Sequence, residues 1–203
     1  MPRGRPRKID PEIVLEKAMT LFWEKGYDGT SMSDLVQATN MAKPGIYATF
    51  GDKEQLYLKA LAHYFECAGK ELFHELAHSE QPLYEAVKTF YEVIMHGVQQ
   101  PDGPRGCLVL NTLVEFAHKA KAPNEIGKDI NDLRTTAFAT RLARAKAEGE
   151  LKADTDIESL THFLSGQTLA IGVMGRSGDS AKAIQGLVDV ALSVLPNANA
   201  KKP

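Results

Sequence analysis

The segment 30–53, TSMSDLVQATNMAKPGIYATFGDK, constrains the fold of this chain more than any other stretch. Ser31 and Asp34 have the spacing of a capping box, in which the serine oxygen accepts a backbone N–H and the acid binds back to the N-cap N–H. A short helix is therefore predicted to begin at Ser31. Asn40 follows it, and asparagine is one of the few residues besides glycine that tolerates the left-handed conformation of a tight turn.

A second short helix is predicted from Ala42 to Phe50. Pro44 suits its first turn, where a missing N–H costs little, and Ile46 and Phe50 are four residues apart on an inward face. Two helices joined by a short turn, the second exposing small and polar residues at its N-terminus, have a geometry that fits a DNA major groove. The residues on the expected solvent face are Lys43, Gly45, Tyr47, Ala48 and Thr49.

The run KPGIYATFGDKEQLY at residues 43–57 resembles the recognition region of the TetR/AcrR transcriptional regulators, which typically reads SKGTLYxxFxxKExL. The departures are Asn40 in place of the usual glycine and Gly51 in place of the usual proline. The alternative is a generic helical hairpin in which Tyr47 only packs. The residues that match the pattern are Lys43, Gly45, Ile46, Tyr47, Phe50, Lys53, Glu54 and Leu56.

The resemblance implies a set of DNA contacts. It implies that Tyr47 and Lys53 contact phosphates, that Lys43 lies at the groove edge, and that the residues at positions 48 and 49 vary with the operator sequence. Together with the basic arm described next, the candidate DNA-binding residues are Arg3, Arg5, Ser31, Lys43, Pro44, Gly45, Tyr47, Ala48, Thr49 and Lys53.

Residues 1–9 form a basic arm, which we expect to be flexible. Arg3 and Arg5 flank Gly4 as in an AT-hook core, an extended strip that lies in a narrow A·T minor groove. The alternative is a disordered tail that adds only sequence-independent attraction to phosphates. The formal net charge of −2 argues against a protein coated in nucleic acid, so the placement of the basic residues matters more than their sum.

Long periodic segments separated by Gly and Pro turns, without a convincing strand, predict an all-α fold. One continuous helix is expected from about Asp52 to Ser79, coupling two domains. A later helix, from about Ile126 to Gly149, is expected to expose a face rich in Arg and Lys. The predicted organisation is a flexible arm at 1–9, a three-helix helix-turn-helix domain at 10–53, a larger helical ligand-binding and dimerisation domain at 54–196, and a disordered tail at 197–203.

The chain shows no secretory signal and no membrane span, because charged MPRGRPRK lacks a following apolar stretch and the longest uncharged run carries several polar residues. Cys67 and Cys107 are too few and too far apart to predict a disulfide framework or a zinc site. A protein of the cytoplasm is therefore expected.

The last two predicted helices, at about 156–175 and 180–195, carry apolar or small residues on more than one face. One face belongs to the core and the other needs a partner. The resemblance implies that these helices form a four-helix bundle across a two-fold axis. A homodimer of this kind presents two recognition helices about 34–36 Å apart to a pseudo-palindromic double-stranded DNA operator.

The resemblance also implies a pocket for a small-molecule effector in the C-terminal domain, without naming the molecule. A buried polar group needs a partner, which makes Asn111, His162 and Gln167 the better polar candidates. Most of the aromatic candidates are expected to be plain core. The candidate ligand-binding residues are Phe90, Tyr91, Ile94, Cys107, Asn111, Phe138, His162 and Gln167.

Cys107 lies in PRGCLVLNTLVEFA, a segment that resembles a branch of the family containing sensors of electrophiles and oxidants. A thiol near a helix N-terminus can ionise more readily, and Arg105 would assist. Modification of this cysteine would disturb packing and release DNA. The alternative is a cysteine that serves as a small buried hydrophobe.

No motif in the chain indicates an enzyme, since GxSxG, GxGxxG, P-loop and HExxH patterns do not occur. His74 and His78 have a spacing that could chelate a metal, but we expect a solvated charged helix face instead, and neither metal nor cofactor is expected. The predicted function is a dimeric repressor released by an effector or by cysteine modification. The alternative is a helical carrier of small molecules without sequence-specific DNA binding.

Overall fold

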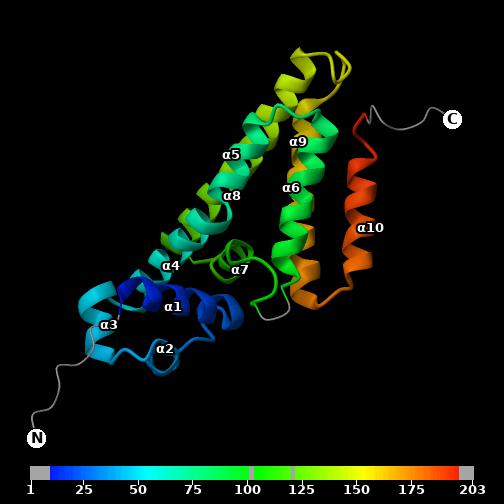
Figure 1. Ribbon diagram of the computed structural model, residues 1–203. Coiled ribbons are helices and arrows are strands. Elements are labelled where there is room, and N and C mark those ends of the chain that lie inside the picture. Colours follow the sequence, from blue (N-terminus) through cyan, green and yellow to red (C-terminus); the bar gives the residue numbers. More distant parts are fainter. Residues whose placement is uncertain (1–9, 101–102, 120–121, 197–203) are drawn as a thin grey trace, which may run out of the picture.

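The computed structural model describes residues 10–100, 103–119 and 122–196, and this part of the chain contains ten α-helices and no strand (Figure 1). The predicted all-α fold is thus confirmed. None of the described helices is long and apolar enough to cross a membrane. The helices are α1 (Pro11–Lys25), α2 (Met32–Thr39), α3 (Lys43–Phe50), α4 (Lys53–Ala68), α5 (Lys70–His78), α6 (Leu83–Val98), α7 (Leu108–Glu115), α8 (Ala122–Ala147), α9 (Ile157–Ser177) and α10 (Ala181–Leu192).

The expected continuous helix from Asp52 to Ser79 is wrong, because Gly69 divides it into α4 and α5. Glycine has a low helix propensity, and this one also leaves room for a ring. A Cβ atom at Gly69 would lie 2.7 Å from Cδ2 of Phe65. The helix-turn-helix end and the C-terminal part of the molecule are therefore connected by two consecutive helices, α4 and α5, instead of one.

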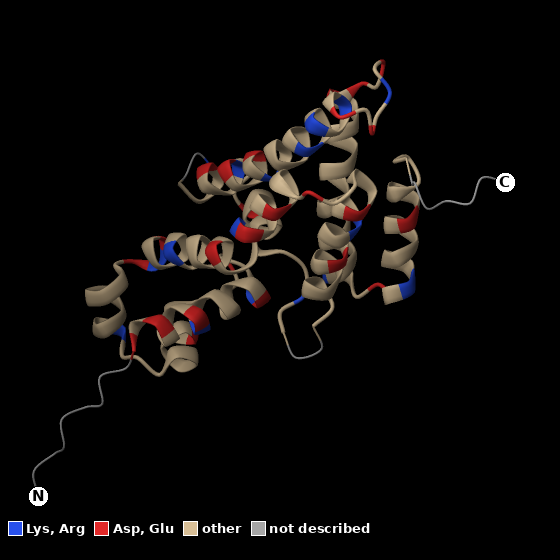
Figure 2. Ribbon diagram, turned by 45° about the horizontal axis from the view of Figure 1, so that its top comes forward, with Lys and Arg blue, Asp and Glu red and all other residues tan. Residues whose placement is uncertain are grey.

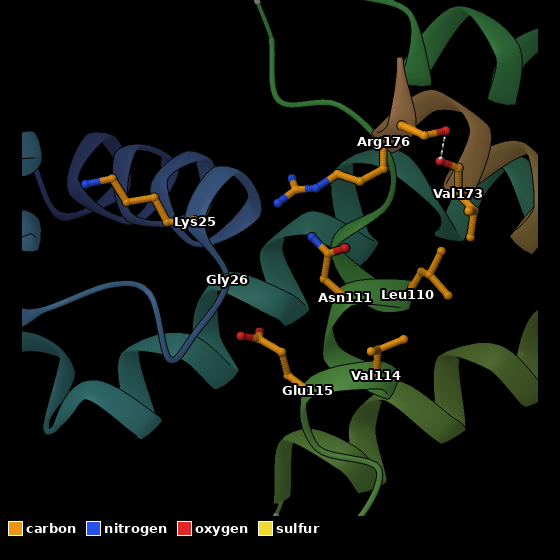
Figure 3. A pocket seen from close by; sticks show the side chains of 9 residues that line it. Lys25, Gly26, Leu110, Asn111, Val114, Glu115, Val173 and Arg176 are labelled. Carbon is orange, nitrogen blue, oxygen red and sulfur yellow. Dashed lines mark hydrogen bonds between the residues drawn. The ribbon is translucent and has the colours of Figure 1, made fainter. Parts of the chain in front are cut away.

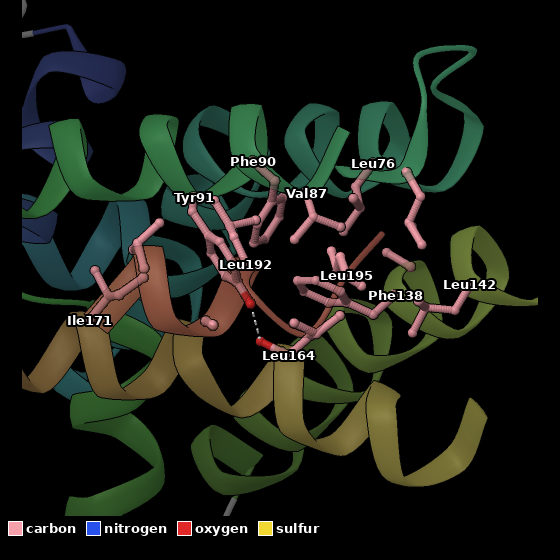
Figure 4. Close-up of a cluster of buried hydrophobic side chains, with 14 of the residues drawn as sticks. Leu76, Val87, Phe90, Tyr91, Phe138, Leu142, Leu164, Ile171, Leu192 and Leu195 are labelled. Atoms are coloured by element: carbon pink, nitrogen blue, oxygen red, sulfur yellow. Dashed lines mark hydrogen bonds between the residues drawn. The ribbon is translucent and has the colours of Figure 1, made fainter. Parts of the chain in front are cut away.

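Two hydrophobic cores organise the molecule. One fills the space among α5, α6, α8, α9 and α10 (Figure 4). The other joins α1 to α4 with α7 and Ile130 of α8, so no core boundary falls at residues 53 and 54. Phe73 of α5 packs against both cores. The second core contains Val14, Ala18, Phe22, Leu35, Ile46, Phe50, Leu56, Tyr57, Ala60, Leu61, Leu108, Val109, Phe116 and Ile130.

Helix α8 does not expose its arginines as expected. Arg134 is 7% exposed and Arg141 is 1% exposed. Nη2 of Arg141 donates to the carbonyl of Gln81 and to Oε1 of Glu150, both at 2.7 Å. The expectation fails for Arg141 because its guanidinium joins the turn between α5 and α6 to the segment after α8, an arrangement of distant segments that helical periodicity does not reveal. Nη2 of Arg134 donates instead to Oδ1 of Asn131 in its own helix.

Candidate nucleic-acid interface

Helix α2 begins at the predicted capping box. The Ser31 oxygen accepts the Asp34 N–H at 3.1 Å, and the Asp34 carboxylate accepts the Ser31 N–H at 2.8 Å. The Ser31 hydroxyl and the Ser31 N–H, which both donate to the Asp34 carboxylate, and Nζ of Lys25 at 3.1 Å hold the pKa of Asp34 well below its usual range. The start of α2 is therefore fixed by an ionised carboxylate.

The turn between α2 and α3 is formed as predicted. Asn40 adopts the left-handed conformation, with φ of 56° and ψ of 20°. Oγ1 of Thr39 donates to the carbonyl of Leu35 at 2.6 Å and accepts the N–H of Met41 at 3.3 Å. The buried threonine thus ties the end of α2 to the residue that leads into α3.

Helix α3 buries one face and exposes the other. Ile46 and Phe50 pack in the core, whereas the Tyr47 side chain is 44% exposed. Ser31 and Asp52 cap their helices with side-chain oxygens, but Ala42 makes no side-chain cap bond at α3. The N-terminus of α3 thus keeps the partial positive charge that attracts phosphate. The exposed residues of this helix are Lys43, Pro44, Tyr47, Ala48 and Thr49.

Other predicted DNA-binding residues also have internal roles. A Cβ atom at Gly45 would lie 3.1 Å from Cγ of Met41, so the glycine lets the turn pack closely. The Ser31 hydroxyl is engaged by Asp34. Nζ of Lys53 lies 4.1 Å from the centre of the Tyr27 ring, and burial lowers the pKa of this lysine. The structure gathers these residues with α3 at one end of the molecule (Figure 1).

Arg3 and Arg5 lie outside the described residues. Basic and acidic side chains are interspersed along the described helices (Figure 2). A contribution of the basic arm to DNA binding therefore stays a prediction from the sequence.

The predicted ligand-binding residues do not surround one pocket. Phe90, Tyr91 and Phe138 are buried in the core, and the Tyr91 hydroxyl donates to the carbonyl of Leu164 at 2.7 Å (Figure 4). Ile94 packs beside them. His162 is exposed on α9.

The remaining polar candidates also lie apart. On α9, Nε2 of Gln167 donates to the carbonyl of Phe163 at 3.1 Å. Asn111 and Cys107 belong to α7 and its N-cap. The polar character of these residues suggested a pocket. Their positions relative to one another depend on how helices far apart in the sequence pack, which residue type does not reveal.

Cys107 is the N-cap residue of α7 and is half-buried. The Tyr64 hydroxyl donates to Sγ at 3.7 Å, and burial, followed by the charge of Cys107, raises the pKa of Tyr64. Burial lowers the pKa of the Arg134 guanidinium, and the charge of Cys107 opposes this shift. The cation acting on the cysteine is therefore Arg134, whereas Nη1 of Arg105 lies against Gly178.

The end of α1 is held by polar side chains of α7 and α9 (Figure 3). Nδ2 of Asn111 and Nη1 of Arg176 donate to the carbonyl of Trp23, at 3.2 and 2.9 Å. Oε2 of Glu115 accepts the N–H of Tyr27 at 2.8 Å. No local sequence pattern indicates these contacts, because the partners are 88 to 153 residues apart.

Comparison with known protein families decides the assignment. The family model described as "Bacterial regulatory proteins, tetR family" matches residues 14–60, which include α2 and α3. The model described as "Tetracyclin repressor-like, C-terminal domain" matches residues 84–190. The chain belongs to the TetR family. This TetR-family protein is a DNA-binding transcriptional regulator.

Relatives match this TetR-family chain over nearly its whole length. It is 31% identical to YezE of Bacillus subtilis, an uncharacterized HTH-type transcriptional regulator, over 95% of this chain and 99% of the relative. It is 27% identical to the HTH-type transcriptional repressor ComR of Escherichia coli, over 96% and 92%. A cysteine mutant of the TetR-family regulator CifR, solved with 26-bp double-strand operator DNA, superposes with a TM-score of 0.84 at 30% identity, over 95% of this chain and all of that chain.

Proposed function

We propose that this TetR-family protein is a repressor that acts in the cytoplasm and binds a pseudo-palindromic operator as a homodimer. The observation that carries the proposal is the division of α3 into a buried face with Ile46 and Phe50 and an exposed face with Tyr47. Two similar Escherichia coli proteins, ComR and BdcR, are named transcriptional repressors. The operator complex of CifR supports the same reading.

The residues of α3 divide into two roles. Lys43 and Tyr47, together with the uncapped N-terminus of the helix, bind phosphates and set the register on the duplex. Ala48 and Thr49 lie on the exposed face farther along the helix and read base edges. The phosphate contacts supply affinity for any duplex, and the base contacts supply the preference for one.

The dimer forms through α9 and α10. Both helices already pack on the core of one chain, yet they keep large apolar side chains in solvent. A second copy would bury these side chains, and a two-fold axis would pair each recognition helix with its half-site. The side chains that a second copy would bury are Phe163 on α9, Val190 on α10 and Val194 just after α10.

Release from the operator follows from a change at Cys107. The Cys107 thiolate adds to the β-carbon of an activated alkene such as a maleimide: a carbon–sulfur bond forms, the C=C π bond breaks, and the carbanion left behind takes a proton from water. The thiol is half-buried and accepts a hydrogen bond from the Tyr64 hydroxyl at 3.7 Å, so an added group has to displace this neighbour. The added group therefore moves α7, whose Asn111 binds the end of α1.

Selection of bound duplexes from a random DNA library by the purified protein tests the proposal. We expect enrichment of an inverted repeat whose half-site centres are about one helical turn apart. Saturable binding without any enriched sequence would instead favour a helical carrier that does not read DNA. The salt dependence of the affinity for the winning duplex would then count the phosphate contacts.

A further inference from the structure

A pocket of about 400 Å³ lies between the end of α1, one face of α7 and the last turns of α9 (Figure 3). Its apolar wall consists of Leu110, Val114 and Val173, and the last two are 70% and 54% exposed. Its polar wall includes Asn111 and Arg176. A lining with an apolar side and few polar groups suits a small amphipathic ligand.

The cation available to such a ligand is Arg176. Its hydrogen bonds go to neutral acceptors, the carbonyls of Trp23 at 2.9 Å, Glu24 at 2.8 Å and Arg105 at 3.5 Å. No carboxylate of the described residues lies within ion-pair distance of this guanidinium. An anion would therefore find an arginine that no acidic side chain has neutralised.

The other charged groups in the wall are already engaged. The Glu115 carboxylate accepts the N–H groups of Tyr27 at 2.8 Å and Asp28 at 3.3 Å. Nζ of Lys25 lies 3.1 Å from Oδ1 of Asp34, and Figure 3 shows its side chain directed away from Arg176. Glu115 keeps its negative charge, but its oxygens are taken up by main-chain N–H groups, so Arg176 is the cation in this wall that no described carboxylate pairs with.

We propose that this pocket binds a small organic anion with an apolar chain, such as a medium-chain carboxylate, and that binding withdraws Arg176 from α1. The inference rests on the proposed function, since DNA release is the event that it would control. The bonds from Arg176 to the carbonyls have one charged partner, whereas a carboxylate would make both partners charged and would accept two parallel N–H bonds from the guanidinium fork. The carboxylate therefore outcompetes the carbonyls of Trp23 and Glu24.

Withdrawal of Arg176 would break the hydrogen bonds from α9 to the Trp23 and Glu24 carbonyls at the end of α1. Helix α1 shares its core with α2 and α3, so its position determines where the recognition helix points. An effector shifts an equilibrium only by its preference for one state. The anion prefers the state in which Arg176 has left α1, and operator affinity falls in proportion to that preference.

The test uses octanoate below its micelle concentration, with 1-octanol and octylamine as probes of the same chain length. Binding is measured by calorimetry and by the fluorescence of Trp23, the single tryptophan, whose carbonyl accepts from Arg176. We expect saturable octanoate binding, and an affinity about 10- to 100-fold weaker in Arg176→Gln. The alcohol and the amine should bind more weakly than octanoate in the parent protein.

A matched pair of substitutions at Val114 tests ligand binding in the pocket without removing the hydrogen bonds of Arg176 to α1. Val114 is largely exposed, so Val114→Glu and Val114→Gln should both fold. Both variants lose the same apolar contact with the octanoate chain, but only the glutamate adds a negative charge to the wall, so Val114→Glu should bind octanoate more weakly than Val114→Gln. Octanoate should accordingly weaken operator binding more in Val114→Gln than in Val114→Glu.

Three results would overturn the proposal. They are equal binding of octanoate and 1-octanol, equal octanoate affinity in both Val114 variants, and octanoate binding that leaves operator affinity unchanged. Operator binding by the ligand-free protein tests the proposed function separately. A protein that binds its operator but not octanoate would contradict only this inference.

Discussion

Nη1 of Arg176 lies 2.9 Å from the carbonyl oxygen of Trp23, so a side chain of α9 binds the end of a helix 153 residues earlier in the chain. Asn111 of α7 donates to the same carbonyl. The first helix of the DNA-reading domain is therefore held from two helices of the C-terminal half. This arrangement gives a change near α7 or α9 a direct route to the recognition helix.

The Tyr47 hydroxyl is expected to contribute affinity without sequence preference. Tyr47→Ala should weaken binding to the selected operator and to unrelated duplexes by similar factors, because phosphate contacts carry no sequence information. Tyr47→Phe is the matched control and should reproduce most of the loss if the hydroxyl donates to phosphate. Fluorescence anisotropy titrations with both duplexes measure the effect. A loss confined to the operator would contradict this role.

The capping box should be worth a measurable part of the stability. Ser31→Ala removes the side-chain oxygen that accepts the Asp34 N–H, and should lower the free energy of unfolding by about 1 kcal/mol. Ser33→Ala, on the exposed side of the same helix, is the control and should have a much smaller effect. Urea unfolding at neutral pH compares the two variants.

The stabilisation from Ser31 should depend on pH, because its hydrogen bonds lower the pKa of Asp34 in the folded state. A lowered pKa stabilises the fold above the unfolded-state pKa of about 3.9, and this stability is lost as the pH falls through the folded-state pKa. The difference between parent and Ser31→Ala should thus shrink in acid. A difference that grows as the pH falls would contradict the assignment.

Tyr57 and Thr112 connect α4 to α7 through a buried hydrogen bond of 2.8 Å. Oγ1 of Thr112 donates to the carbonyl of Leu108, so the Tyr57 hydroxyl is the donor between the two side chains. A double-mutant cycle with Tyr57→Phe and Thr112→Val should give a coupling energy of about 1 kcal/mol. Additive effects of the two substitutions would show that the bond does not stabilise this junction.

Cys107 should be the residue through which thiol reagents weaken DNA binding. N-ethylmaleimide should lower the operator affinity of the parent at least about tenfold, a loss of roughly 1.4 kcal/mol. Cys107→Ser should keep the affinity of the untreated parent and resist the reagent. Cys67 is exposed, so Cys67→Ser is the control and should remain sensitive. Equal sensitivity of Cys107→Ser and the parent would exclude Cys107 as the sensor.

Local signals in the sequence were enough to predict the helix-turn-helix. The capping box of Ser31 and Asp34 and the left-handed Asn40 depend on residues within a few positions of one another, and both were confirmed. The burial of Arg134 and Arg141 could not be predicted, because it depends on partners from distant segments and charged residues are usually exposed.

The contacts of Arg176 were hidden for the same reason. A guanidinium that binds main-chain carbonyls leaves no complementary side chain in the sequence to pair it with. Phe90, Tyr91 and Phe138 are buried, as expected for aromatic residues of a core. Their residue types did not show whether they also line a pocket. Sequence periodicity identifies which residues are apolar, whereas the three-dimensional arrangement decides whether they enclose a pocket.

The most direct test of the central claim is duplex selection repeated with the parent and Thr49→Ala side by side. The claim that α3 reads the bases predicts that Thr49→Ala still binds DNA, with a changed or relaxed preference at the same position in each half-site. Tyr47→Ala, selected in parallel, should enrich the parental repeat at lower affinity. An unchanged repeat for Thr49→Ala together with an altered repeat for Tyr47→Ala would contradict the assignment of roles on this helix.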